Sequence, residues 1–197
     1  TIREIGWNSN VFDEPPSESP KEDYVASLQP DVSLFTQLRF LKFSAYGGSE
    51  LTYYRQFDSE RSVGHAVRGR VDLLLSRVRP FVGGGQTKSR TRPNGEIDVR
   101  ADRTDEELSG GLAFELGAHS LVYAAAVRTH NGFESALQSG IDLGESLTRN
   151  GYDYSAGVQT ALTPLLSVTV TGGYREDRFE GDPNRNTESA MASAQFR

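Results

Sequence analysis

Two short segments combine residue types that could make a hydrolytic site. Ser62 precedes His65 by three residues, and His130 is followed closely by Glu134 and Ser135. A serine, a histidine and a carboxylate can together generate a nucleophile, but such triads are recognised by geometry, and no spacing here repeats one. The histidines also fall at expected strand ends or in expected loops. We therefore expect no catalytic residue and predict that the chain is not an enzyme.

Glycine and acidic clusters could instead form a phosphate loop or a metal site. Gly83-Gly84-Gly85 is followed by residues typical of strand and loop, whereas a phosphate loop needs a helix whose amides face the anion. A strand kept slim where the wall bends or a side chain crosses explains these glycines better. Asp177, Asp182 and Asn184 match no calcium-loop spacing. The chain also has no cysteine, so we expect no cofactor and no metal.

A third group of candidates consists of charged side chains at alternate positions in apolar segments. Mixed charges on the wall of a water-filled lumen would select among ions and polar solutes. The alternative is a narrow, closed lumen filled by interlocking ion pairs, because burying such groups unpaired is costly. The expected lumen-lining residues are Lys42, Glu50, Arg68, Arg70, Asp72, Glu115, Arg128, Asp153 and Arg175.

The elements that would position these charges are strands, because apolar residues recur with a period of two. The alternation is clear over 41–54, 108–116, 152–162 and 166–175. These segments exceed the roughly 5–6 residues of ordinary strands and suit membrane-spanning strands of about 9–11 residues. The expected lipid-facing residues are Leu41, Phe43, Leu112, Phe114, Val158, Leu166, Val168 and Val170. Aromatic residues near strand ends, here Trp7, Tyr53, Tyr152 and Tyr174, are expected to form a girdle at the membrane interface.

Short and long connections alternate along the chain. The short ones are 37–39, 76–79, 117–119 and 163–165, and the long ones are 57–64, 87–107, 131–151 and 176–187. Transmembrane barrels have tight periplasmic turns and long extracellular loops, whereas a Greek-key sandwich has no reason to sort loop length by end. The pattern predicts an all-β, antiparallel, up-and-down transmembrane barrel of about ten strands. Residues 1–197 would be one barrel domain or part of a larger barrel.

Composition agrees with that class. The 197 residues carry a formal net charge of −6, which argues against a nucleic-acid partner. No apolar run approaches the ~18–20 residues of a spanning helix. We expect a bacterial outer-membrane location with the signal peptide removed. The charge-dense 87–107 segment is expected to be an extracellular loop, either solvated or touching lipopolysaccharide phosphates through its arginines.

Three motifs resemble a known family. Gly6-Trp7-Asn8-Ser9-Asn10-Val11-Phe12 is similar to the aromatic-x-x-Asn-Val-Phe opening of the β-barrel porin 2 group of bacterial outer-membrane proteins. Tyr53-Tyr54 with Ser59-Glu60-Arg61 and His65 resembles the hairpin after that family's second short turn. Leu162-Thr163-Pro164-Leu165 resembles its periplasmic turn. The resemblance implies a porin-like barrel in the outer membrane of a Gram-negative cell. Because family members are generally longer, it also supports the larger barrel.

The leading functional expectation is a channel for polar solutes. The resemblance adds exopolysaccharide export and, with it, periplasmic polysaccharide-export proteins as partners beside outer-membrane lipid. One alternative is a plugged structural or adhesive barrel that acts through its extracellular loops. Another is a soluble β-sandwich that binds carbohydrate.

Overall fold

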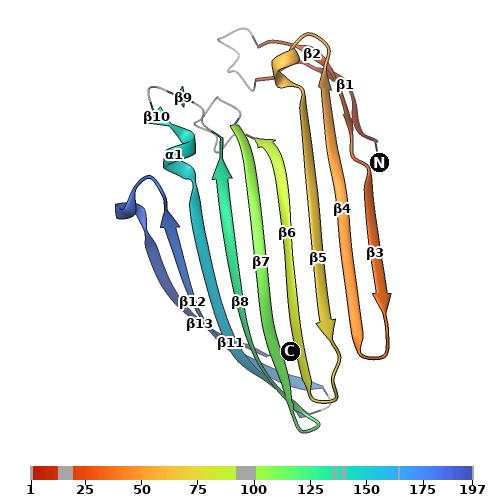
Figure 1. Cartoon of the computed structure of the whole chain (residues 1–197), viewed down its shortest axis with the longest axis vertical. Coiled ribbons are helices and arrows are strands. Elements are labelled where there is room, and N and C mark those ends of the chain that lie inside the picture. Colours follow the sequence, from red (N-terminus) through yellow and green to blue (C-terminus); the bar gives the residue numbers. More distant parts are fainter. Residues whose placement is uncertain are drawn as a thin grey trace.

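The computed structural model describes residues 2–12, 20–91, 101–134, 137–138, 141–163 and 165–196. Within them the chain is almost entirely extended (Figure 1). The strands are β1 (Ile2–Asn8), β2 (Asp23–Leu28), β3 (Asp31–Gln37), β4 (Leu41–Tyr54), β5 (Ser62–Leu73), β6 (Val78–Thr91), β7 (Ala101–Leu116), β8 (Ser120–Phe133), β9 (Leu137–Gln138), β10 (Ile141–Asp142), β11 (Arg149–Thr163), β12 (Leu166–Phe179) and β13 (Thr187–Phe196). Short helical turns occur at α1 (Leu143–Leu147), Asp58–Glu60 and Pro183–Arg185. No helix among the described residues is long and apolar enough to cross a bilayer.

The main sheet is antiparallel and joins each long strand to the next one along the chain, which confirms the predicted up-and-down class. Its order is β1-β2-β4-β5-β6-β7-β8-β11-β12-β13, with β3 also paired to β4. β2 and β3 both pair with β4 and are two halves of one edge, interrupted at Gln29 and Pro30. The Ser49 amide still donates to the Pro30 carbonyl at 3.0 Å, so the ladder continues past the break. With the halves joined, ten strands match the expected number.

The short turns all lie at one end of the sheet (Figure 1). They are 38–40, 74–77, 117–119 and the connection from Thr163 to Leu166. Gly117 has a φ of 78°, a conformation that glycine adopts without the penalty a Cβ would bring. The opposite end carries the longer connections, including the small β9–β10 hairpin and α1, which the alternation did not predict.

The strands run further toward that opposite end than expected. Residues 87–91 and 101–107, predicted as loop, belong to β6 and β7 and pair residue by residue. The prediction was wrong because charge was taken to end the strand. Instead, opposite charges at this end of the sheet support the ladder. The Lys88 ammonium lies 3.9 Å from Asp102 in β7 and 2.9 Å from Glu134, which follows β8. The charged residues Arg92, Glu96, Asp98 and Arg100 lie outside the described residues.

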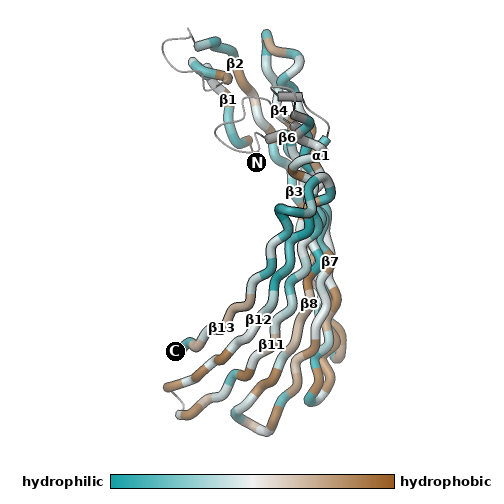
Figure 2. Tube along the Cα trace, turned by 90° about the vertical axis from the view of Figure 1, so that its left-hand side faces the viewer, coloured by the Kyte–Doolittle hydropathy of each residue, from teal (hydrophilic) through white to brown (hydrophobic). Residues whose placement is uncertain are grey.

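The sheet curves strongly, like part of a barrel wall, and its lower half is the more apolar in Figure 2. It does not close. In the described part of the chain, β13 pairs only with β12, and β3 pairs only with β4. The term wall is used below for β3–β8 with β11–β13, without residues 52–61.

The second region, called the N-terminal lobe, comprises residues 2–12 and 20–28 with the 52–61 end of the β4–β5 hairpin. Among the described residues, the only buried hydrophobic side chains are Val11, Val25 and Tyr54, and all three are here. Phe12 and Phe57 pack against them, with ring centroids 5.0 Å apart at 79°.

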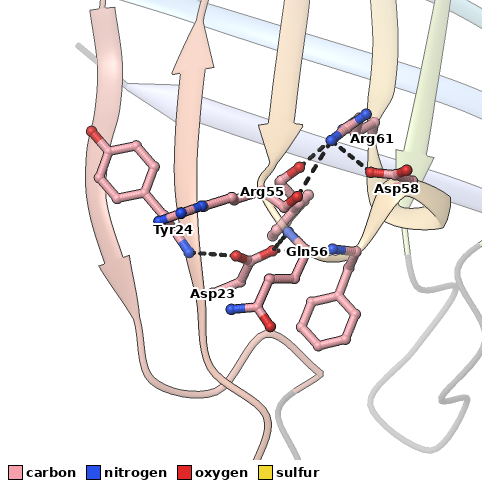
Figure 3. Close-up of polar contacts among 8 residues, drawn as sticks. Asp23, Tyr24, Arg55, Gln56, Asp58 and Arg61 are labelled. Atoms are coloured by element: carbon pink, nitrogen blue, oxygen red, sulfur yellow. Dashed lines mark hydrogen bonds and ion pairs between the residues drawn. The ribbon is translucent and has the colours of Figure 1, made fainter.

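A buried carboxylate ties the lobe together (Figure 3). Asp23 is 0% exposed and accepts hydrogen bonds from the backbone amides of Tyr24 (2.7 Å), Gln56 (2.8 Å) and Phe57 (3.2 Å). Burial alone would raise the pKa of Asp23, but these amide hydrogen bonds and the charge of Arg55 outweigh it and lower that pKa below its ordinary value. The ionised carboxylate therefore links β2 to the β4–β5 hairpin.

Candidate functional site

The register of the wall divides its side chains into two faces, because directly opposed residues of an antiparallel pair project to the same side. One row across the strands reads Phe43, Val71, Val82, Gly110, Ala126, Tyr154, Tyr174 and Ala190. The neighbouring row reads Ser44, Arg70, Gly83, Ser109, Val127, Asp153, Arg175 and Ser189. We call these the apolar face and the polar face.

All eight predicted lipid-facing residues lie on the apolar face. In β4 they are Leu41 and Phe43, in β7 Leu112 and Phe114, in β11 Val158, and in β12 Leu166, Val168 and Val170. The wall buries little of this face. Leu112 is 46% exposed, Val158 44% and Val170 53%.

The polar face receives all but one of the predicted lumen-lining residues: Lys42, Glu50, Arg68, Arg70, Asp72, Glu115, Asp153 and Arg175. Arg128 is the exception, and its assignment was wrong. Arg128 opposes Leu108 and Tyr152, so it belongs to the apolar face. That face turns polar where the strands extend past the apolar residues, and charge alone could not reveal the change.

The charges of the polar face pair along the wall. Arg70 donates to Asp72 within β5, with a shortest contact of 2.7 Å, and its guanidinium lies 3.9 Å from the centre of the Phe81 ring. Arg79 pairs with Glu115 on the adjacent strand. Arg175 contacts Asp177 at 3.1 Å and Asp153 at 3.8 Å.

Glu50 lies at the top of this face and links it to the lobe. Its carboxylate accepts from Arg3 at 2.8 Å. The polar face therefore holds ion pairs within strands, between adjacent strands and, through Arg3 and Glu50, with β1.

Glycines on the polar face leave room for side chains that cross from the next strand. A Cβ built on Gly111 would lie 2.5 Å from the Phe81 ring, and one on Gly157 would lie 2.6 Å from the Tyr123 ring. The Tyr123 hydroxyl reaches over Gly157 to Thr171 at 2.6 Å. The same holds in the glycine run, where a Cβ on Gly85 would lie 2.7 Å from Cγ of Arg68. The slim-strand explanation of this run is confirmed.

A groove of about 610 Å³ opens over the glycine run 83–85 on the polar face. Its lining spans β3 to β8 and includes Tyr46, Arg68, Asp105, Glu107 and Asn131. Sequence reasoning missed Asp105 and Glu107 because both fell in the predicted 87–107 loop. Extending the alternation backward from Leu108 could have found them.

Of the four aromatic residues predicted to form a girdle, two lie on the same face of adjacent strands and two lie at the lobe. Tyr152 and Tyr174 share the apolar face on β11 and β12, where that face passes from apolar to charged residues. Tyr53 lies in β4 at the lobe. Trp7 lies in β1, 56% exposed, and its Nε1 donates to Glu22 at 3.2 Å.

The residues considered for hydrolysis are not brought together. Ser62 and His65 stand three apart in β5, so their side chains project to opposite faces. Nδ1 of His130 lies 3.1 Å from the Asn150 side-chain oxygen, and Ser135 falls outside the described residues. Within the described ranges, no group of three or more His, Asp or Glu residues could hold a metal ion.

Comparison with known proteins does not assign the chain to a family. No family model matches it, and no curated protein matches it. Membership of the β-barrel porin 2 group therefore stays a prediction. Among solved structures, the chain is similar to the crystal structure of Neisserial surface protein A. The match covers 96% of this chain and 96% of that protein's chain, at 16% sequence identity and a TM-score of 0.29. Because that score is too low to carry an argument, the fold rests on the strand register described above.

Proposed function

We propose that this chain forms the wall of a β-barrel in a bacterial outer membrane and serves as a porin-like channel for polar solutes. The observation that carries the proposal is the contrast between the two faces of one curved sheet. One face exposes aliphatic and aromatic side chains, and the other carries ion pairs and a groove whose lining includes charged residues. In a membrane barrel the apolar face would contact the bilayer and the polar face would line a water-filled lumen.

The hydrophobic effect supports the membrane setting. Burial of apolar surface is the main favourable term in folding in water. Within the described residues, the buried hydrophobic side chains are confined to the lobe, and the wall has none. Soluble monomers rarely expose an apolar patch larger than roughly 300–600 Å². A soluble sandwich would need a second sheet over the apolar face, and the described residues form a single large sheet with a separate two-stranded hairpin.

The course of the ion pairs favours an open lumen over a plugged one. Arg70–Asp72 and Arg175–Asp177 join residues of the same strand, and Arg79–Glu115 joins adjacent strands. Such pairs neutralise charge along the wall and leave the space in front of it free. A plugged barrel would instead use its charges to interlock opposite walls.

The solute class follows from the mixed charge of the lining, which suits hydrated polar molecules more than ions of one sign. Exopolysaccharide export, with periplasmic export proteins as partners, is a second candidate that rests on the family resemblance. Lipopolysaccharide and other outer-membrane lipid would surround the apolar face. The proposal gives the chain no catalytic role, no cofactor and no nucleic-acid partner.

Conductance of the purified full-length protein in a planar lipid bilayer tests the channel. We expect discrete current steps whose size bounds the lumen. Stable insertion without steps would support the plugged barrel and move the search for function to the loops. Failure to insert, with the protein monodisperse without detergent, would overturn the membrane proposal.

A further inference from the structure

One row of the polar face carries two charges that have no partner among the described residues. The row runs from Arg68 in β5 through Gly85 in β6 to Glu107 in β7. Both charged side chains line the 610 Å³ groove and both are exposed. Neighbouring charges are satisfied, since Arg70 pairs with Asp72, and Asp105 accepts from Arg103 at 2.8 Å.

Gly85 separates the two charges without filling the space between them. Cγ of Arg68 lies over Gly85, so the side chain leaves its own strand on the side of the strand that carries Glu107. Adjacent strands are about 4.8 Å apart, which places the two backbones roughly 10 Å from each other. The comparable row Tyr123–Gly157–Thr171 is closed by a 2.6 Å hydrogen bond across its glycine. The Arg68 row has no such closure.

We infer that Arg68 and Glu107 form a binding site for a zwitterion, specifically a free α-amino acid. The guanidinium fork binds the ligand carboxylate through paired hydrogen bonds, and the Glu107 carboxylate binds its ammonium group. A simple anion would meet repulsion from Glu107, and a simple cation would meet it from Arg68. Only a ligand that carries both signs compensates both side chains for the water they lose.

The rest of the groove accommodates the remainder of the ligand. Tyr46 opposes Arg68 and Thr129 opposes Glu107, and both residues line the same groove. The inference rests on the proposed function for solute access, because the groove faces the proposed lumen. It narrows the solute class from polar molecules to amino acids.

Equilibrium binding of L-alanine to the full-length protein in detergent micelles tests the site, with propionate and n-propylammonium as single-charge probes of similar size. We expect both probes to bind at least fivefold more weakly than alanine. Arg68→Gln and Glu107→Gln should each weaken alanine binding at least fivefold. Arg79→Gln, the matched control at the ion pair with Glu115, should bind alanine as the unmodified protein does.

Circular dichroism of each variant establishes that it is folded. The double exchange R68E with E107R should bind alanine better than either single Gln variant, because it restores both signs in the groove. Equal binding of propionate or n-propylammonium, or alanine binding that is insensitive to both Gln substitutions, would overturn the inference.

The binding measurement requires no conductance, so the two proposals fail separately. Alanine binding that depends on Arg68, in a protein that gives no current steps, would remove the channel and keep the site. Current steps from a protein that does not bind alanine would keep the channel and remove the site.

Discussion

The N-terminal lobe and the wall use the same antiparallel strands but are stabilised differently. The lobe buries Val11, Val25 and Tyr54 and holds the ionised Asp23 on three backbone amides, as a water-soluble domain does. The wall buries no hydrophobic side chain in its described part and exposes its apolar face. Under the proposed function, the difference reflects two surroundings, water at the lobe and lipid at the wall. Substitutions should therefore separate the two regions.

The largest effect is expected from an arginine on the apolar face. Val170→Arg would place a charge near the middle of β12 facing lipid, at a cost of roughly 2–4 kcal/mol, and should abolish insertion into vesicles. Thr169→Arg, one residue away on the polar face, should insert normally. The measurement is the fraction of protein that floats with vesicles and shows heat-modifiable migration. Equal behaviour of the two variants would mean that the faces are wrongly assigned.

The lobe should respond to the loss of its carboxylate. Asp23→Ala leaves three amides without their acceptor and should unfold the lobe at lower urea, while the wall stays folded. Trp7 is the single tryptophan and lies in β1, so its fluorescence reports the lobe. Circular dichroism reports the wall. Simultaneous loss of both signals would show that the two regions unfold as one unit.

A matched glycine pair tests packing within the wall. Gly157→Ala puts a Cβ 2.6 Å from the Tyr123 ring and should cost about 1–3 kcal/mol through overpacking. Gly172→Ala meets nothing within 4 Å and should be neutral or stabilising by up to about 1 kcal/mol. Urea unfolding in micelles, followed by circular dichroism, measures both. An equal decrease in the free energy of unfolding of both variants would argue against the close contact between Tyr123 and Gly157.

The smallest effect near neutral pH concerns the titration of Asp23. Because its folded pKa lies below the unfolded value of about 3.9, its contribution to stability is present above that value and is lost as pH falls through the folded pKa. Trp7 fluorescence should be unchanged down to about pH 5 and change only below about pH 4. Asp23→Asn should lack this acid transition. A transition retained in that variant would assign it to another group.

The period-two pattern predicted most of the wall because residues of the apolar face and of the polar face alternate along each strand. It failed where both faces carry polar residues. There the alternation of hydropathy fades although the strand continues, so 101–107 was taken as loop and Arg128 was placed on the wrong face. The break before β3 could have been predicted from Pro30, because proline lacks the backbone amide that a strand ladder needs. Arg68 and Glu107 have no partner among the residues that the structure describes, and this depends on register, so it could not be predicted from the sequence.

The Tyr123 ring, which lies over Gly157, helps to set the register between β8 and β11. A slip of one residue exchanges the two faces and is rejected by the hydropathy pattern. A slip of two residues preserves the faces, so hydropathy does not oppose it. Such a slip of β11 would bring Ser155 or Gln159 beneath the Tyr123 ring in place of Gly157, where even a Cβ does not fit. Gly157 thus favours the native register over the two-residue slip that the hydropathy pattern alone would allow.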